Sequence, residues 1–307
     1  MVRIAHISDI HFGKIAHPHI VDELIKDINQ ADVDLVVVSG DLTQRAFGHQ
    51  FRAARRMLDA FDAPTLVVPG NHDVYPWWRI VSRLFDPLRR YRRLICANLS
   101  PRFELSAADC RRFGSPAFKF PTPATPATPA TPATPATPTT PPPGKADPVI
   151  VVQGINSAFG WTIQGGRILP VDLRQIENGF KDVPTSAFKI LVVHHHLAEL
   201  TLLGDHDLSK GAEKAFDTAH KAKVDLILSG HLHISHVAHV PRHEGDKPIV
   251  VATSGTSTSS RGRGDDPTGN FYNVIDISPT NFLIAEKRFN PANGKYEGTQ
   301  ETVCERF

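Results

Sequence analysis

The chain has 307 residues, of which 41% are hydrophobic, and its 34 basic and 32 acidic residues give a formal net charge of +2. This length can bury a large core, and the charge balance gives no reason to expect a nucleic acid or an anionic membrane as partner. Three widely spaced cysteines, Cys96, Cys110 and Cys304, indicate neither a disulfide framework nor a cysteine-based zinc site.

Short apolar runs rich in β-branched residues predict strands along most of the chain. Their near-continuous apolar character is typical of strands that are covered on both faces. The first run begins at the second residue, and polar side chains soon interrupt it, which is not the pattern of a secretory signal. No run approaches the roughly 20 apolar residues of a membrane span, so we expect a soluble, cytoplasmic protein. The predicted strands are Val2–Ile7, Asp34–Ser39, Thr65–Val68, Val149–Gln153, Lys189–Val193, Asp225–Ser229, Pro248–Ala252, Phe271–Ile277 and Phe282–Lys287.

Helical patterns lie between the early strands. Pro18–Gln30 and His49–Phe61 both carry apolar residues at helical spacing. Alternating strands and helices predict βαβ units, a mainly parallel sheet and therefore an α/β fold class. The last strands follow one another more closely, which predicts a second sheet or a mixed one.

A proline-rich repeat interrupts this alternation at about residues 121–147. Its Pro-Ala-Thr triplets have no glycine at every third place, so they do not form a collagen-like segment. Proline at this density favours polyproline II or disorder, and the strand pattern resumes at Val149. We expect a flexible insert in an exposed loop rather than a boundary between domains. Recognition of the repeat by a proline-binding partner is the less favoured alternative.

Metal-ligating residue types follow five of the predicted strands. Because ligands gather outside the carboxyl ends of strands in parallel α/β sheets, these five strand ends are expected to converge. Carboxylate, amide and imidazole groups bind manganese, iron or zinc, and two such ions can activate a water and stabilise both oxygens of a displacement at phosphorus. In an extended segment, residues i and i+2 point the same way. This would bring Asp9 next to His11, and His231 next to His233. The set is Asp9, His11, Asp41, Asn71–Asp73, His194–His196, His231 and His233.

The motifs in this order resemble those of the calcineurin-like metallophosphoesterase superfamily. They are D-x-H at Asp9, G-D-x-x-x-R at Asp41, G-N-H-D at Asn71, H-H at 194–196 and G-H-x-H at His231. The resemblance implies a four-layer αββα sandwich, with one domain over residues 1–307 and a dinuclear metal site.

The resemblance also implies a role for each motif residue. The first ion would be held by Asp9, His11, Asp41 and His233, and Asp41 would bridge to a second ion held by Asn71, His231 and one histidine of the 194–196 run. His72 would contact the substrate phosphate and protonate the leaving oxygen, with Asp73 orienting it. Arg45 would support the site by a salt bridge.

The identity of the histidine ligand after the strand at Lys189–Val193 depends on the alignment. Relatives have His-His-Pro at this place, and the first histidine is the ligand. Aligning Leu197 with that proline assigns His195, which is the assignment we prefer, whereas aligning His196 with it assigns His194.

Further segments resemble bacterial proteins similar to class III cyclic-nucleotide phosphodiesterases: SGDLTQRA at 39–46, VVPGNHDV at 67–74, SGTSTSSRGRG at 254–264 and NFYNVIDI at 270–277. The resemblance implies a phosphodiesterase or phosphatase that acts on a small phosphate ester, with a 3',5'-cyclic nucleotide as one candidate. Two alternatives are a nuclease of the same superfamily and a non-catalytic scaffold with the same fold. No nucleic acid and no membrane is expected as partner.

Two basic segments are further candidates for substrate contact. Residues 77–93 combine two tryptophans with six arginines, and one of the aromatic rings could stack on a nucleobase. We favour an amphipathic cap with solvated arginines, in which Ile80, Val81, Leu84, Phe85 and Leu88 pack inward. Arg261 and Arg263 lie in a Ser/Gly-rich loop that either reaches the phosphate or stays at the surface.

Overall fold

The computed structural model describes residues 1–105, 149–162, 165–200, 208–262 and 269–306. The predicted insert at about 121–147 lies outside the described residues, as do Cys110 and Arg263. No helix among the described residues has the length and the apolar composition needed to span a membrane.

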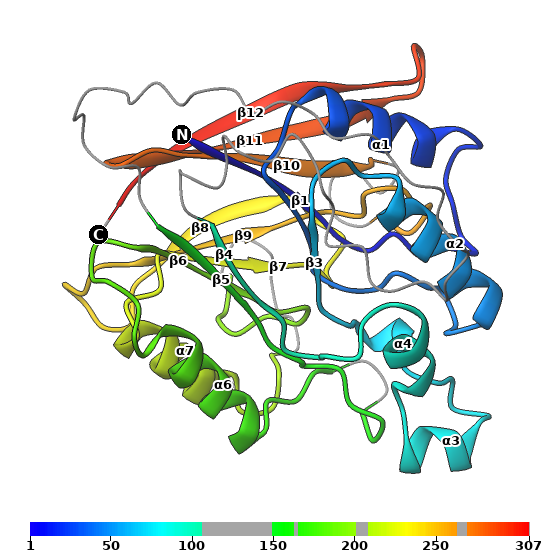
Figure 1. Ribbon diagram of the computed structural model, residues 1–307, viewed down its shortest axis with the longest axis horizontal. Helices are drawn as coiled ribbons and strands as arrows, with labels where there is room; N and C mark the ends of the chain where they lie inside the picture. The colour runs from blue at the N-terminus through cyan, green and yellow to red at the C-terminus, as the bar shows by residue number, and fades with distance from the viewer. Residues whose placement is uncertain (106–148, 163–164, 201–207, 263–268, 307) are drawn as a thin grey trace, which may run out of the picture.

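Two six-stranded sheets form the centre of the molecule (Figure 1). The strands of the first sheet lie in the order β12 (Lys295–Glu305), β11 (Asn281–Asn290), β10 (Phe271–Ile277), β1 (Val2–Ile7), β2 (Leu35–Val38) and β3 (Thr65–Val67). The strands of the second lie in the order β4 (Arg102–Leu105), β5 (Ile150–Gly154), β6 (Phe188–Val192), β7 (Leu226–Ser229), β9 (Ile249–Thr253) and β8 (His236–Val240).

Helices cover the outer faces of both sheets. Figure 1 shows α1 (Ile20–Gln30) and α2 (Gly48–Asp59) on one side of the sheets, and α6 (Pro170–Phe180) and α7 (Ala212–Lys221) on the other. Three buried apolar clusters match this layering, because one lies between the sheets and one lies beneath each helix layer. The predicted α/β fold class and the four-layer αββα arrangement are therefore confirmed.

Strand β2 is apolar throughout because both of its faces are buried. In β2, Leu35 and Val37 pack in the cluster between the sheets, whereas Val36 and Val38 pack beneath α1 and α2. The two faces of a strand alternate at every residue, so a strand buried on both sides cannot alternate apolar with polar residues. Full burial of each such side chain contributes about 1.5–3 kcal/mol.

The sheets are mixed rather than mainly parallel. β1, β2 and β3 pair in parallel, as do β5, β6, β7 and β9, but β10, β11 and β12 extend the first sheet in antiparallel pairs. The predicted strands are all found. The unpredicted strands β4, β8 and β12 each lie at the edge of a sheet, where one side faces solvent and the sequence lacks a continuous apolar run.

A short cap follows β3. It consists of the 3₁₀ turn η1 (Asn71–Asp73), α3 (Ile80–Phe85) and α4 (Arg89–Leu94). Within the cap, Leu88 and Tyr91 are buried in the cluster beneath α1 and α2. The other four apolar residues that were predicted to pack inward, Ile80, Val81, Leu84 and Phe85, are exposed, so that prediction was wrong.

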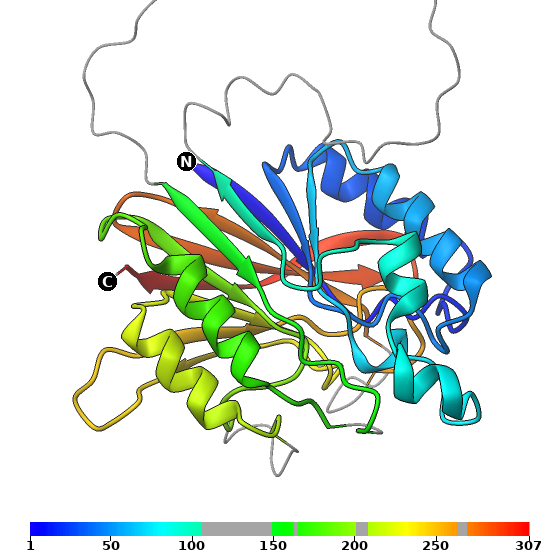
Figure 2. The same cartoon turned by 60° about the horizontal axis from the view of Figure 1, so that its bottom comes forward.

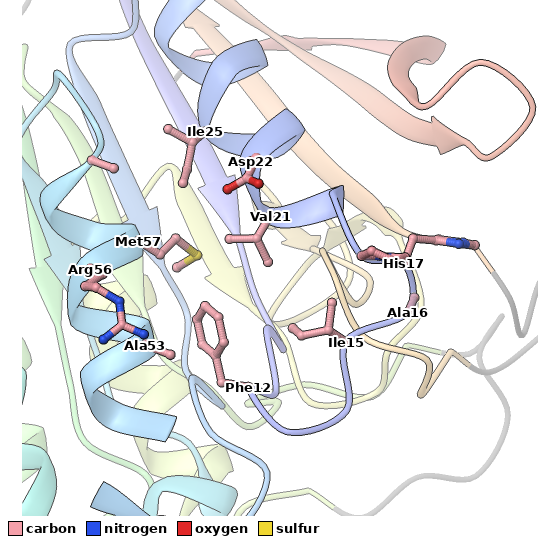
Figure 3. A pocket seen from close by; sticks show the side chains of 12 residues that line it. Phe12, Ile15, Ala16, His17, Val21, Asp22, Ile25, Ala53, Arg56 and Met57 are labelled. Atoms are coloured by element: carbon pink, nitrogen blue, oxygen red, sulfur yellow. The ribbon is translucent and has the colours of Figure 1, made fainter. Parts of the chain in front are cut away.

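A groove of about 730 Å³ lies between α1 and α2 (Figure 3). Its apolar floor includes Phe12, Val21 and Met57, and Asp22 and Arg56 also line it. Phe12 directly follows His11, but the lining residues include none of the predicted metal ligands.

Candidate metal centre

The loops after β1 and β2 continue the pairing of their strands. The backbone N–H groups of Asp9, His11 and Phe12 donate to the carbonyls of Gly40, Asp41 and Leu42, with N···O distances of 3.1, 2.9 and 2.9 Å. Because these bonds link one loop to the other, the side chains that follow β1 are held beside those that follow β2.

Five of the predicted ligands have a left-handed backbone. The φ angles are 53° at Asp9, 49° at His11, 53° at Asp41, 72° at His231 and 60° at His233. The expectation of an extended i, i+2 arrangement was therefore wrong for both pairs. A left-handed residue costs about 1–2 kcal/mol, although Asp and His are among the residues that tolerate it best. Such backbone strain is typical of functional sites.

A first cluster consists of Asp9, His11, Asp41 and His233, all buried, with one ligand atom from each lying within 4.8 Å of the others. His233 Nε2 lies 3.1 Å from Asp9 Oδ1. His11 Nε2 lies 3.5 Å from the same oxygen, 3.6 Å from Asp41 Oδ2 and 3.2 Å from His233 Nε2. The ring of His233 is held in this orientation by its other nitrogen, Nδ1, which donates to the carbonyl of Arg261.

A second cluster adjoins the first through Asp41. His194 Nε2 lies 3.5 Å from Asp41 Oδ2 and 3.1 Å from Asn71 Oδ1. His231 Nδ1 lies 3.2 Å from the same Asn71 oxygen. His231 and His233 therefore belong to different clusters, whereas Asp9 and His11, which also have a left-handed backbone, share one.

The three consecutive histidines have three different surroundings. His194 Nδ1 donates to the carbonyl of Ser39 at 2.7 Å, which directs Nε2 towards Asp41 and Asn71. His195 Nδ1 lies 2.8 Å from Ser157 Oγ, although its ring also lies close to that of His231. His196 Nε2 donates to the carbonyl of Gly230 at 3.1 Å. His194 is thus the histidine whose contacts join the two clusters.

Positive charge balances the two buried carboxylates. Burial alone would raise the pKa of Asp9 and of Asp41, yet the surrounding histidines, including His233 beside Asp9 and His194 beside Asp41, hold both well below the usual range. Burial likewise opposes a charged ring at His194, but Asp41 and Asp9 raise its pKa to about 9. Burial and the neighbouring His194 together lower the pKa of His231 to about 3.

The donor set fits divalent metal ions. Ligand atoms about 2.0–2.2 Å from one ion lie roughly 3.0–3.5 Å from each other, and most contacts within the two clusters fall close to this spacing. Asp9 Oδ1 is fully buried, and its neighbours are two imidazole nitrogens, His233 Nε2 at 3.1 Å and His11 Nε2 at 3.5 Å. A buried carboxylate oxygen is costly unless a hydrogen-bond donor or a cation satisfies it, and a cation held by these three side chains would do so.

His72 lies beside the first cluster, with its ring centroid 4.8 Å from that of His11. Its Nδ1 donates to the carbonyl of Gln44 at 2.8 Å, and its Nε2 accepts a hydrogen bond from Arg261 Nη1 at 2.7 Å. The Gln44 carbonyl therefore orients the ring. The family resemblance had implied this role for Asp73. Burial lowers the pKa of His72.

Asp73 stabilises the loops rather than the ring of His72. Its buried carboxylate accepts hydrogen bonds from the backbone N–H groups of Leu42, Thr43 and Gly70 and from the Thr43 hydroxyl, at 3.0–3.2 Å. Burial and the neighbouring Asp41 raise the pKa of Asp73 to about 7. Its contacts join the loop after β2 to the turn after β3.

Arg45 lies outside both clusters. Its guanidinium lies over the ring of Trp78, 5.3 Å from the ring centroid. Arg45 forms no ion pair within the described part of the chain, so the expected salt bridge is not found there.

Two serines at the site were not singled out in the sequence. Ser8 Oγ donates to Asp9 Oδ2 at 2.7 Å, and Ser157 Oγ contacts His195. Ser8 directly precedes a predicted ligand, which is a weak signal, whereas nothing near Ser157 in the sequence indicates its contact.

Sequence comparison identifies a family. The sequence model of the calcineurin-like phosphoesterase family matches residues 2–235. A glycerophosphodiester phosphodiesterase, GpdQ, from Enterobacter lignolyticus is 36% identical over 81 residues, which are 23% of this chain and 29% of that protein. A probable cyclic nucleotide phosphodiesterase from Vesicomyosocius okutanii is 30% identical over 69 residues, 22% of this chain and 30% of that protein. The matched segments thus span less than a third of either relative.

Solved structures share the fold at low sequence identity. Purple acid phosphatase PPD1 from yellow lupin superposes with a TM-score of 0.60 and 13% identity, over 99% of this chain and 54% of that one. GAP50, described as the anchor in the inner membrane complex of Plasmodium, gives a TM-score of 0.57 and 13% identity, over 100% of this chain and 89% of that one. At this identity, the likeness concerns the fold alone.

Proposed function

Since this chain belongs to the calcineurin-like phosphoesterase family, we propose that it is a dinuclear metal-dependent hydrolase of small phosphodiesters. The observation that carries the proposal is the position of Asp41 Oδ2, which lies 3.6 Å from His11 Nε2 and 3.5 Å from His194 Nε2. One buried carboxylate oxygen therefore faces both clusters, as a bridging ligand must.

Each cluster offers a complete ligand set in this proposal. The first ion would be held by Asp9, His11, Asp41 and His233, and the second by Asp41, Asn71, His194 and His231. We propose His194 in place of His195, because the His194 ring reaches both Asp41 and Asn71. Carboxylate, amide and imidazole ligands suit manganese, iron or zinc.

His72 and Arg261 carry the remaining chemistry in this proposal. Ions held in the two clusters would supply an activated water and would neutralise charge on the phosphate oxygens. The Gln44 carbonyl fixes one proton of His72 on Nδ1, which leaves Nε2 as the atom that could take up a proton from the attacking water and pass it to the leaving oxygen. Arg261 now donates to that Nε2, and an anionic phosphate would draw this guanidinium into a charge-assisted hydrogen bond.

Two named relatives support a small diester as the substrate. The relatives from E. lignolyticus and V. okutanii are both described as phosphodiesterases, one for glycerophosphodiesters and one for cyclic nucleotides. We propose a compound of this class, with a 3',5'-cyclic nucleotide as the first candidate.

A metal-reconstituted assay tests the proposal. The full chain is stripped with a chelator, reloaded separately with manganese, iron, cobalt or zinc, and assayed on bis-p-nitrophenyl phosphate, p-nitrophenyl phosphate, cyclic AMP and single-stranded DNA. We expect turnover of the diesters, and loss of both metal ions and of activity in Asp41→Ala. Turnover confined to DNA would support a nuclease instead. No turnover with any metal would support a non-catalytic scaffold, and two ions per chain in Asp41→Ala would contradict the bridging role.

A further inference from the structure

An apolar patch lies on the cap that follows η1. Its most exposed members recur every four residues: Trp77 is 69% exposed, Val81 71% and Phe85 85%. Trp78, Ile80 and Leu84 are exposed beside them. In Figures 1 and 2, α3 lies at the outer edge of the molecule. A solvent-exposed cluster of large apolar side chains on this scale is typical of an interaction surface.

A second segment adds Trp161 to the same patch. Arg83 of α3 donates to the carbonyl of Thr162 at 2.6 Å, and Gly160 lies so close to the Arg83 carbonyl that an added Cβ would come within 2.2 Å of it. Trp161, between Gly160 and Thr162, is 68% exposed. We call Trp77, Trp78, Ile80, Val81, Leu84, Phe85 and Trp161 the tryptophan patch, since it contains all three tryptophans of the chain.

The surroundings of the tryptophan patch are strongly basic. The segment from Trp77 to Arg93 contains six arginines and a single acidic residue, Asp86, although the whole chain has a net charge of only +2. Arg79, Arg89 and Arg93 are exposed and form no ion pair within the described residues. The near-balanced total therefore conceals a basic segment that also carries the exposed aromatic rings.

We propose that the tryptophan patch and its flanking arginines bind the surface of an anionic lipid bilayer. Tryptophan is enriched where a membrane meets water, because its ring is apolar and its N–H is polar. Basic residues beside such rings are attracted to anionic headgroups. With six residues, α3 is far too short to span a bilayer, so the patch would lie in the interface. A second copy of the chain is a poorer occupant, because a two-fold contact would bring the same arginines together.

Binding in this way would bring the candidate metal centre close to the bilayer. Trp77 follows Asp73 by four residues, which limits the span between them to about 15 Å. Trp78 also lies beneath Arg45, which follows Gln44, the partner of His72. The proposal itself needs neither metal nor turnover, so it can fail without any consequence for the proposed function.

Vesicle binding by the full chain tests the proposal. The probes are vesicles of phosphatidylcholine alone and of phosphatidylcholine mixed with phosphatidylglycerol, with cosedimentation and tryptophan emission as readouts. We expect binding to the anionic vesicles, weakened by salt, and a blue shift of the emission, since every tryptophan lies in the patch. Absence of binding to anionic vesicles would overturn the proposal, as would equal binding to both kinds of vesicle.

Variants distinguish vesicle binding by the tryptophan patch from non-specific hydrophobic adsorption. Val81→Asp with Phe85→Asp should weaken binding to anionic vesicles by at least about tenfold, whereas Val303→Asp on β12, where Val303 is also 69% exposed, should leave it unchanged. Arg89→Gln and Arg93→Gln should each weaken binding by roughly fivefold. Circular dichroism would establish that each variant is folded. Unchanged vesicle binding by the Val81/Phe85 variant would overturn the proposal. The proposal would also be overturned if the unmodified chain bound no vesicles but formed a concentration-dependent dimer that the Val81/Phe85 variant does not form.

Discussion

Gly40 offers a sharp test of how the backbone positions the metal centre. Its φ is +98°, and a Cβ added there would lie 2.6 Å from His194 Nδ1 and 2.9 Å from the backbone nitrogen of Gly70. Neither neighbour can easily move. The buried His194 ring is fixed by Ser39 at one nitrogen and by Asn71 at the other, and the nitrogen of Gly70 is backbone.

The size of the effect of Gly40→Ala follows from two separate penalties. A non-glycine residue in this region of φ costs about 1–2 kcal/mol, and overpacking against fixed atoms costs about 1–3 kcal/mol more. The free energy of unfolding should therefore fall by about 2–5 kcal/mol, a large part of the 5–15 kcal/mol typical of a folded protein. Because the added methyl group would displace His194, binding of the second ion should weaken as well.

Two control variants separate these penalties. Gly245 has a φ of +88° with nothing within 4 Å of an added Cβ, so Gly245→Ala isolates the backbone penalty. Gly70 has a φ of −105°, but an added Cβ there would lie 2.1 Å from Asp41 Oδ1, so Gly70→Ala isolates the steric one. Urea unfolding and metal content would be measured for all three. Equal stability and metal content in Gly40→Ala and Gly245→Ala would refute this reasoning.

Three further predictions concern the side chains of the site. His194→Ala should lose one of two bound ions by elemental analysis, whereas His195→Ala should keep both; the reverse result would restore His195 as the ligand. His72→Ala should keep both ions but lower kcat by roughly 10²–10⁴-fold, as for a lost general acid, and normal turnover would remove His72 from the mechanism. Arg261→Ala should lower kcat/KM for an anionic diester by roughly 10–100-fold, since hydrogen bonds to charged groups contribute about 1.5–3 kcal/mol, with partial recovery in Arg261→Lys. An unchanged kcat/KM would exclude phosphate binding by this residue.

The sequence predicts a strand or helix correctly where the spacing of its apolar residues matches the faces that the fold buries. Val36 and Val37 face different buried clusters, so their strand is apolar throughout and is evident in the sequence. Edge strands such as Lys295–Glu305 face solvent along one side and are mostly polar, which leaves little pattern to detect. The cap was misjudged for the opposite reason, because Phe85 has the spacing of a core residue and yet is exposed.

The candidate site was predictable in its residue types but not in its contacts. Strand ends indicated which side chains converge, since parallel strands bring their carboxyl ends together. They could not rank His194 against His195, because identical neighbouring side chains differ only in the direction that the backbone gives them. Net charge averaged over the chain could not reveal the arginines around Trp77, because acidic residues elsewhere cancel them.

The left-handed backbone at five proposed ligands limits which substitutions the loops can tolerate during evolution. Asp, Asn and His tolerate this backbone better than most residues, and they are also the residue types that bind these metals. An exchange such as Asp41→Asn would therefore keep the loop in shape while removing the charge that faces both clusters. A chain of this fold can therefore lose its activity by one substitution and still fold. An intact fold in a distant relative says little about whether that relative is an active enzyme.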